Sequence, residues 1–257
     1  MKNILLSNDD GIHAAGLWAL KRRLEHSHRV FVVAPDRERS AAGHAISLHD
    51  PIRLKVVEEG RVYAVNGTPV DAVHVALLGV VREKIDLVVA GVNHGLNLGS
   101  DVFYSGTVSA AFQAVAFGIP GIAVSIDIEG DPVCYDTAAY YAEQVVNKIV
   151  KSPPEGKMEG KIVLNLNVPN REVEAVRGVQ LTSLGNRVYE DRLIEREDPK
   201  RNKYYWIDGS LVHDVPDEGT DVAAVKQGFV SITPLQKDIT ARDYLPRLKE
   251  RGFDRLS

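Results

Sequence analysis

Polar residues with metal-binding and phosphate-binding chemistry follow three apolar runs of the 257-residue sequence. Asp9 and Asp10 come after the first run, the segment Pro35–His44 after the second, and Gly91–Gly99 after the third. In open α/β sheets, ligands bind beyond the carboxyl ends of the strands, so we expect these segments to open on one edge. Together they offer two carboxylates, a hydroxyl and amide oxygens. This all-oxygen set suits Mg²⁺ or Mn²⁺ far better than zinc, and it predicts a divalent metal site.

The pair Asp9 and Asp10 has a simpler interpretation when it is taken alone. A polar turn that caps a helix would use the same residues, and by itself that interpretation is the better one. Because the pair follows a predicted strand and stands beside two further oxygen-rich loops, the metal site is favoured. Gly11 would then allow a tight turn close to the ion.

Residues 104–107, with the sequence Tyr-Ser-Gly-Thr, begin an alanine-rich stretch that should be a helix. Free N–H groups and the positive end of the helix dipole make such an N-terminus a good receptor for phosphate. A routine Ser or Thr cap would leave the same pattern. Because Asn97 and Gly99 lie just upstream, in the loop that also carries Asn93, we predict that an anion binds here.

Apolar runs and helical periodicities alternate along the chain. The predicted strands are Ile4–Leu6, Val30–Ala34, Leu87–Ala90, Ile122–Ser125 and Ile162–Leu166. The predicted helices cover Leu17 to Leu24, Thr68 to about Arg82, Ser105 to Phe117, and the stretch around Tyr141, Val145 and Ile149. Such alternation indicates right-handed βαβ units. The fold class is therefore α/β, with a largely parallel, doubly wound, Rossmann-like sheet.

Shorter segments complete this pattern. The alternating segment Ile52–Val56 and the apolar run Val62–Val65 that follows Glu59-Gly60 predict a hairpin. The charged segment Asn186–Gly209 has adjacent aromatic residues near its end and predicts an extended arm, either an exposed hairpin or a contact with a partner subunit. A helix near Asp221–Gln227, a strand at Phe229–Thr233 and a last helix near Ala241–Arg251 follow. We predict one domain over residues 1–257, with the arm at about 186–209 and a C-terminal oligomerisation segment at about 229–257.

Composition limits the class of protein. An apolar content of 44%, a charged content of 26% and a net charge of -4 are typical of a soluble globular protein and not of a basic nucleic-acid binder. Cys134 is the single cysteine and cannot form an intrachain disulfide, which fits a reducing compartment. The apolar stretch Val108–Ile126 is interrupted by polar residues, glycine and proline. We therefore expect no membrane span and a cytoplasmic location.

Several known catalytic motifs are absent from the sequence. It has no P-loop, no G-x-G-x-x-G in the first turn, no G-x-S-x-G elbow and no H-E-x-x-H. These absences argue against P-loop binding of nucleotide triphosphates and against a dinucleotide cofactor. His44 and His94 lie in candidate site loops and are weaker candidates for phosphate contacts or proton donors.

Five spaced motifs, taken in order, resemble the SurE family of survival proteins, the 5'/3'-nucleotidases. They are Ser7-Asn8-Asp9-Asp10-Gly11, Ala34-Pro35-Asp36 with Ser40 and Gly43-His44, Gly67-Thr68-Pro69-Val70-Asp71, Gly91 to Gly99, and Tyr104-Ser105-Gly106-Thr107-Val108-Ser109. The tail segment Ser231–Leu235, followed by Asp238 and Thr240, also resembles that family. The resemblance therefore covers nearly the whole chain.

The resemblance implies one divalent ion, Mg²⁺ or Mn²⁺, in each subunit. The metal ligands that it implies are Asp9, Asp10, Ser40 and Asn93, and the residues that it implies around the phosphate are Asn97, Ser105, Gly106 and Thr107. It implies hydrolysis of nucleoside 5'- and 3'-monophosphates, with polyphosphate as a further substrate class. It also implies a homodimer or homotetramer in which hairpins and C-terminal segments are exchanged between subunits. The sequence departs from the family at Ala72, Ala90 and Gln113, which puts substrate preference in question and leaves the implied ligands intact.

Alternatives remain open for the mechanism and for the function. Asp9 and Asp10 are the catalytic candidates, as a base toward water or as a direct nucleophile, and we favour metal-activated water assisted by Asp9. A signalling receiver also places an acidic pair after its first strand, but it needs a phosphorylatable aspartate where Asn93 stands. A nucleotide-binding regulator without turnover is the other alternative.

Overall fold

The computed structural model describes residues 1–151, 162–215 and 217–255, with the side chains of 210–215 left out. The strands are β1 (Asn3–Ser7), β2 (Arg29–Pro35), β3 (Leu54–Glu58), β4 (Val62–Val65), β5 (Leu87–His94), β6 (Gly121–Ile126), β7 (Ile162–Val168), β8 (Val179–Leu181), β9 (Asn186–Glu197), β10 (Lys203–Val215) and β11 (Val230–Gln236). The α-helices are α1 (Ala15–Glu25), α2 (Pro69–Val75), α3 (Gly106–Ala116), α4 (Tyr135–Lys151), α5 (Asp221–Lys226) and α6 (Tyr244–Glu250). The α/β alternation expected from the sequence is confirmed.

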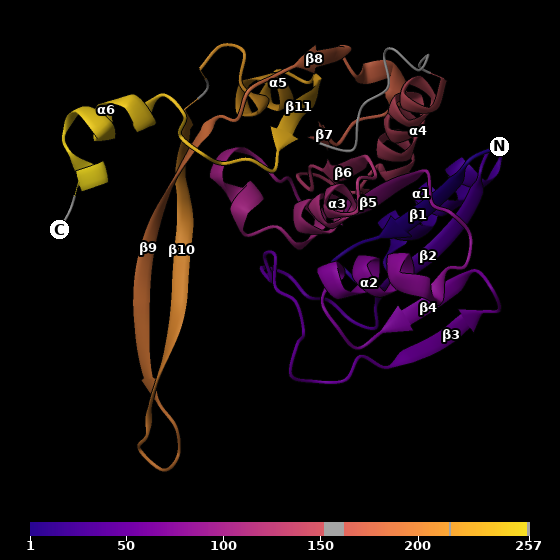
Figure 1. Cartoon of the computed structure of the whole chain (residues 1–257), viewed down its shortest axis with the longest axis horizontal. Helices are drawn as coiled ribbons and strands as arrows, with labels where there is room; N and C mark the ends of the chain where they lie inside the picture. Colours follow the sequence, from indigo (N-terminus) through magenta and orange to yellow (C-terminus); the bar gives the residue numbers. More distant parts are fainter. Residues whose placement is uncertain (152–161, 216, 256–257) are drawn as a thin grey trace.

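A nine-stranded sheet of the described residues has the order β3-β4-β2-β1-β5-β6-β7-β11-β8 (Figure 1). Its central strands are parallel, whereas β3 and β11 run antiparallel to their neighbours β4 and β7. The chain order reverses about β1, because β2 lies on one side of it and β5 on the other. In doubly wound sheets this reversal opens a crevice at the carboxyl ends of the two strands, and ligands bind there.

Helices cover both faces of the sheet. On one face, α1 and α4 pack through residues such as Leu20 and Ala142 against Ile4 and Leu6 of β1. On the other face, α2 and α3 cover Leu5, the residue between them. Successive strand side chains point to opposite faces, so a strand buried on both sides is a continuous apolar run. This is why the short apolar runs of the sequence predict the central strands correctly.

The helix α2 begins as expected and ends earlier. Thr68 and Asp71 form a reciprocal capping box, with Pro69 in the first turn. The sequence predicted a helix to about Arg82, but α2 ends at Val75 and continues as a π-type turn, η1 (Ala76–Val80). Gly79, with φ of 149°, breaks the helical geometry within that turn.

The strand β5 is longer than the apolar run Leu87–Ala90 that predicted it. It continues to His94, with an irregular register against β6 between Ala90 and Asn93. Asn93 was expected in a loop and instead lies on the last part of the strand. Polar residues at a strand end hide such an extension from a hydrophobicity pattern.

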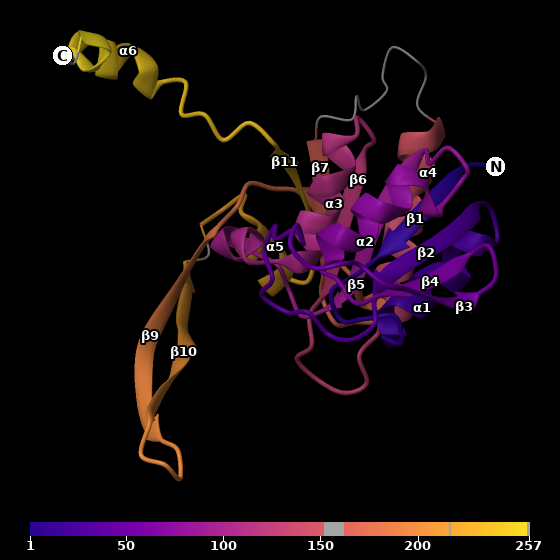
Figure 2. The same cartoon turned by 60° about the horizontal axis from the view of Figure 1, so that its bottom comes forward.

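Two segments extend away from the body in both views (Figures 1 and 2). The strands β9 and β10 form a long antiparallel hairpin, which confirms the predicted arm. The hairpin ends at Val215, six residues beyond the predicted end at Gly209. The predicted C-terminal segment divides into two parts, since β11 pairs with β7 in the main sheet and only the chain after Gln236 leaves it. In the part of the chain that the structure describes, no helix combines the length and apolar character needed to cross a membrane.

Candidate active site

The turn after β1 places the acidic pair at the reversal point of the sheet. Asn8 donates its side-chain amide to the Gly11 carbonyl (2.9 Å), and Gly11 adopts a φ of 98°. A Cβ atom at Gly11 would lie 2.9 Å from the carbonyl carbon of Arg37, in the loop after β2. The tight turn therefore needs glycine at this position. The missing side chain lets the turn after β1 pack directly against the loop after β2. Two of the three predicted segments meet in this way.

Asp9 is buried and lies against the N-terminus of α3. The Thr107 hydroxyl donates to Asp9 Oδ1 at 2.5 Å and lies 3.4 Å from Asn93 Oδ1. A Cβ atom at Gly106 would lie 2.8 Å from the Asp9 Cβ and 2.9 Å from Oδ2, so only glycine leaves room for the carboxylate. The structure thus brings together Asp9, Asn93, Gly106 and Thr107, which the sequence named from three separate segments.

Asp10 lies beside Asp9 and is held by the end of β5. The His94 backbone N–H donates to Asp10 Oδ2 at 3.0 Å. The His94 imidazole Nδ1 is in turn 2.6 Å from the hydroxyl of Tyr135, the first residue of α4. Tyr135 packs closely against α1, since a Cβ at Gly16 would lie 3.0 Å from its ring and 2.2 Å from the Val92 carbonyl oxygen.

The electrostatics of the pair favour a bound cation. Burial raises the pKa of Asp9, although hydrogen bonds from Thr107 oppose this. Burial, and then the negative charge of Asp9, raise the pKa of Asp10 to about 6. A divalent cation would offset both causes by supplying positive charge and ligands to the desolvated oxygens. In this respect the donor set fits Mg²⁺ or Mn²⁺.

The chemistry of the donors also limits which metal fits. Among the described residues, no group of three or more His, Cys, Asp or Glu side chains is arranged so that it could hold a metal ion. Two carboxylates with hydroxyl and amide oxygens are a hard set, which magnesium and manganese accept and zinc does not prefer. The fit therefore depends on Asn93 and Ser40 as much as on the acidic pair.

Ser40 is the predicted ligand whose side chain makes no hydrogen bond to the acidic pair. Its side chain is exposed, and its hydroxyl donates to Glu38 at 2.7 Å. The neighbouring residue is tied to the site, because the Arg39 backbone N–H donates to the Asp9 carbonyl at 2.7 Å. Ser40 therefore follows directly on a residue bound to Asp9, but no hydrogen bond joins its own side chain to the acidic pair.

The N-terminus of α3 carries the Ser cap that the sequence left as the alternative to an anion site. The Ser105 hydroxyl accepts a hydrogen bond from the Val108 N–H at 3.0 Å, which is the routine cap considered above. The Thr107 hydroxyl is directed to Asp9. Both hydroxyls are thus committed to protein partners, and the backbone N–H groups of Gly106 and Thr107 also interact with the Asp9 carboxylate. An anion at this end of α3 would therefore share those N–H groups with Asp9.

Asn97 lies in a buried polar network instead of open solvent. Its amide donates to the Ser125 hydroxyl (2.7 Å), and its backbone N–H donates to Asn167 Oδ1 (2.8 Å). Its carbonyl oxygen accepts from the side chains of Asn165 (2.9 Å) and Asn167 (3.1 Å). The network fixes the loop that leads from β5 to α3, while a direct contact between Asn97 and phosphate stays a prediction.

Some members of this site were missed at the level of sequence. Asn165 and Asn167 lie two residues apart in an otherwise apolar strand, so they share a face, and that pattern could have identified them. Tyr135 had no such signal, because its contact with His94 spans 41 positions in the sequence.

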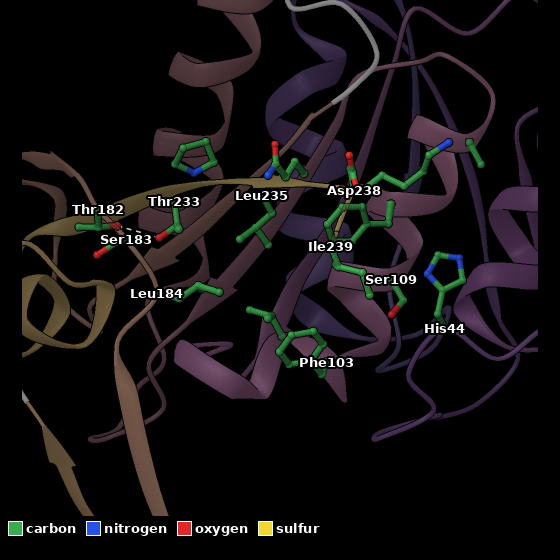
Figure 3. Close-up of a pocket in the computed structure, with 16 residues that line it drawn as sticks. His44, Phe103, Ser109, Thr182, Ser183, Leu184, Thr233, Leu235, Asp238 and Ile239 are labelled. Atoms are coloured by element: carbon green, nitrogen blue, oxygen red, sulfur yellow. Dashed lines mark hydrogen bonds between the residues drawn. The ribbon is translucent and has the colours of Figure 1, made fainter. Parts of the chain in front are cut away.

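A cavity of about 810 Å³ lies beside α3, apart from the acidic pair. Figure 3 shows Phe103, Leu184 and Leu235 around its apolar part, with His44 and Ser109 at one end. Neither Asp9 nor Asp10 lines it. His44, a weaker candidate for phosphate contact, lies 3.1 Å from Gln113 Oε1 through Nε2. The volume of a cavity therefore does not identify the candidate site in this protein. The site is identified by the position of the two carboxylates.

Comparison with known proteins gives a consistent result. A family model described as survival protein SurE matches residues 4–191. The 5'-nucleotidase SurE of Natranaerobius thermophilus is 44% identical over 98% of this chain and 99% of its own length. That of Chloroflexus aggregans is 44% identical over 96% and 97%. The crystal structure of the SurE protein from Aquifex aeolicus superposes with a TM-score of 0.83 at 35% identity, covering 97% of this chain and 99% of that one.

Proposed function

The chain belongs to the SurE family, and from that premise we propose that it is a metal-dependent nucleotidase that hydrolyses nucleoside monophosphates to nucleoside and phosphate. The observation that carries the proposal is the convergence at Asp9. A buried carboxylate, the Asn93 amide and the N-terminus of α3 meet there within one hydrogen-bonded cluster. Such a cluster offers a cation site and an anion site side by side, an arrangement suited to metal-assisted hydrolysis of a phosphate ester.

The proposed metal ligands are Asp9, Asp10, Asn93 and Ser40, holding one divalent ion per subunit. The raised pKa of both aspartates supports this assignment, because it indicates negative charge held without enough compensation. Ser40 would have to release Glu38 to join them. The ion, when bound, would neutralise charge on the phosphate oxygens and acidify a water molecule.

The residues of the chain have distinct roles in this proposal. The backbone N–H groups at Gly106 and Thr107 would receive the phosphate and stabilise charge on its oxygens as the ester bond breaks. The Thr107 hydroxyl orients Asp9 through Oδ1. Asp9 would take a proton from the attacking water through its other oxygen. A phosphoaspartyl adduct trapped on Asp9 would replace this route by direct nucleophilic attack.

The proposed substrates are nucleoside 5'-monophosphates and 3'-monophosphates, with polyphosphate as a further one. The matched relatives are named 5'-nucleotidases, which supports the first of these most directly. Nucleic acid and membrane are not expected partners, given the net charge of -4 and the absence of a basic face in the sequence. We also propose that the protein acts in the cytoplasm.

A homodimer or homotetramer is part of the same proposal. The arm exposes Trp206 and Ile207, and the C-terminal helix α6 exposes Tyr244 and Leu245. Large apolar side chains seldom remain in water on segments that leave the body of a protein, so a second subunit is expected to cover them. Sedimentation of the intact chain measures this directly, and a monomer at micromolar concentration would contradict it.

A phosphate-release assay tests the activity. Purified protein is given a panel of 5'- and 3'-nucleoside monophosphates with Mn²⁺ or Mg²⁺, and then with a chelator in excess. We expect release that stops on chelation and returns when metal is added back. The absence of release from every nucleotide in excess Mn²⁺ would overturn the proposal and favour a binding protein without turnover.

A further inference from the structure

The first residues of the arm contact the segment that leads into α3. That segment is a short 3-10 helix, η2 (Gly99–Phe103), and it carries Asp101. The Arg187 guanidinium donates to Asp101 Oδ2 through Nη1 at 2.5 Å. The Tyr189 hydroxyl lies 2.9 Å from both carboxylate oxygens of Asp101. Both donors belong to β9, so one carboxylate binds two residues of the arm.

This contact is shielded from water, unlike an ion pair of the same kind farther along the arm. The side chains of Arg187 and Asp101 are 15% and 20% exposed. Those of Arg192 and Asp208, which pair within the arm, are 69% and 40% exposed. The Arg187 guanidinium also lies over the Tyr189 ring, 5.6 Å from its centroid, so the two donors support each other. Because a partly buried ion pair is screened less by salt than an exposed one, the contact at Asp101 fixes the arm more firmly.

The main chain of Asp101 holds the start of α3. Its carbonyl oxygen accepts hydrogen bonds from the N–H groups of Tyr104 (3.0 Å) and Ser105 (3.1 Å). Ser105 is the N-cap of α3, and the two residues after it supply N–H groups that interact with the Asp9 carboxylate. Asp101 thus binds the arm with its side chain and the N-cap of α3 with its main chain.

A second carboxylate joins the same two segments. Asp221 is buried, and its Oδ2 accepts from the Gly99 N–H at 3.0 Å while its Oδ1 accepts from the Gly185 N–H at 2.7 Å. Gly99 is the first residue of η2, and Gly185 directly precedes β9. A Cβ atom at Gly99 would lie 2.6 Å from the Gly185 carbonyl oxygen, so the two segments are in direct contact. The arm and the start of α3 are therefore tied by Asp221 at the first residues of both segments, and again by Asp101.

We propose that Asp101 is a positioning residue for phosphate binding, which joins the arm to the N–H groups at the start of α3. Arg187 and Tyr189 fix its carboxylate, and the peptide after it is thereby held so that those N–H groups lie beside Asp9. Asp101 itself touches neither substrate nor metal in this proposal. A displacement of the arm would weaken phosphate binding through this contact. The proposal rests on the anion site proposed above for α3, and it adds the residue that orients that site.

The test compares Asp101→Asn with Asp208→Asn. Both changes remove a carboxylate that pairs with an arginine of β9, but Asp208 makes its pair within the arm. We measure the binding of inorganic phosphate by calorimetry in excess Mg²⁺, at concentrations at which sedimentation gives each variant the oligomeric state of the wild type. Phosphate should bind about tenfold more weakly to Asp101→Asn, because a charge-assisted contact that orients the N–H groups is lost. Asp208→Asn should bind phosphate as the wild type does.

A milder variant covers the case in which Asp101→Asn does not fold. Tyr189→Phe removes one donor to Asp101 and changes no charge, so phosphate should bind about threefold more weakly with the fold intact. Equal binding by Tyr189→Phe and the wild type would then decide against the proposal.

Urea unfolding separates positioning from a purely structural role. A residue that only stabilises the fold would lower the unfolding midpoint and leave phosphate affinity unchanged, and that result for Asp101→Asn overturns the proposal. An equal loss of affinity in Asp101→Asn and Asp208→Asn also overturns it. If the wild type binds phosphate but releases none from any nucleotide, the proposed function fails while this comparison still decides the role of Asp101. A wild type that binds no phosphate would overturn the anion site, and this proposal with it.

Discussion

Replacing Thr107 by valine tests how Asp9 is held. Thr107 is fully buried, and its hydroxyl donates to Asp9 Oδ1 at 2.5 Å. Valine keeps the branched shape and removes only the donor, so the carboxylate loses a bond that opposes the effect of burial on its pKa. Thr107→Ser keeps the donor and loses one methyl group, which makes it the matched control.

The expected loss follows from the strength of that bond. A hydrogen bond to a charged group contributes about 1.5–3 kcal/mol, and leaving a buried carboxylate oxygen without it costs a similar amount. If the transition state needs the same Asp9 geometry, this corresponds to a decrease of about 10- to 150-fold in kcat/KM. Affinity for Mn²⁺ should fall as well, because the carboxylate is a proposed ligand.

The assay is steady-state phosphate release from a nucleoside monophosphate at saturating Mn²⁺, with Mn²⁺ titrations by calorimetry and unfolding curves as a check on folding. Thr107→Ser should remain within about threefold of the wild type, since its donor is retained. If Thr107→Val is folded and also falls within threefold of the wild type, the hydroxyl does not hold Asp9 and the reasoning is refuted.

Three further perturbations address the surroundings of the site. Gly106→Ala places a Cβ 2.9 Å from Asp9 Oδ2, so activity should fall at least tenfold by phosphate release while Ser109→Ala on the same helix stays active, and equal activity of the two variants would count against this crowding. Tyr135→Phe removes the hydroxyl 2.6 Å from His94 Nδ1, and the lost neutral hydrogen bond should weaken Mn²⁺ binding about fivefold by calorimetry, a change that unaltered binding would disprove. Burial alone would raise the pKa of Asp71, but hydrogen bonds from Ser47 and Thr68 hold that pKa below its ordinary value. Ionised Asp71 therefore stabilises the fold above the pKa of the unfolded chain, and this contribution disappears as pH falls through the lower folded pKa. In urea unfolding, Asp71→Asn should cost about 1–2 kcal/mol at neutral pH, with the difference constant to about pH 5 and shrinking below pH 4, whereas a difference that already fades at pH 6 would contradict this.

The fold was largely predictable because its signals are local. Continuous apolar runs such as Val30–Ala34 correspond to strands buried on both faces, and the capping box at Thr68 and Asp71 marks the start of α2. The end of α2 was predicted wrongly, since Gly79 changes the backbone within a run that remains apolar. The length of β5 was also underestimated, because polar residues occupy its last positions.

The site was predictable to the extent that it follows strand ends. Asp9 and Asn93 could be brought together from the rule that parallel strands end on one edge, and the structure places both at the Thr107 hydroxyl. The orientation of each side chain was not predictable. Ser40 bonds to Glu38, and Asn97 turns into a buried network whose partners lie about 70 positions away. Such contacts depend on the packing of β5, β6 and β7 together, which local sequence does not encode.

The most direct test of the proposed metal centre is the anomalous scattering of crystals soaked in Mn²⁺. We expect one peak per subunit between Asp9, Asp10 and Asn93, with ligand oxygens at about 2.0–2.2 Å and with Ser40 turned away from Glu38 to join them. The same soak of Asp10→Asn should lose most of the peak. A peak elsewhere in the subunit, or none at saturating Mn²⁺ in crystals that retain phosphatase activity, would contradict a metal centre at the acidic pair.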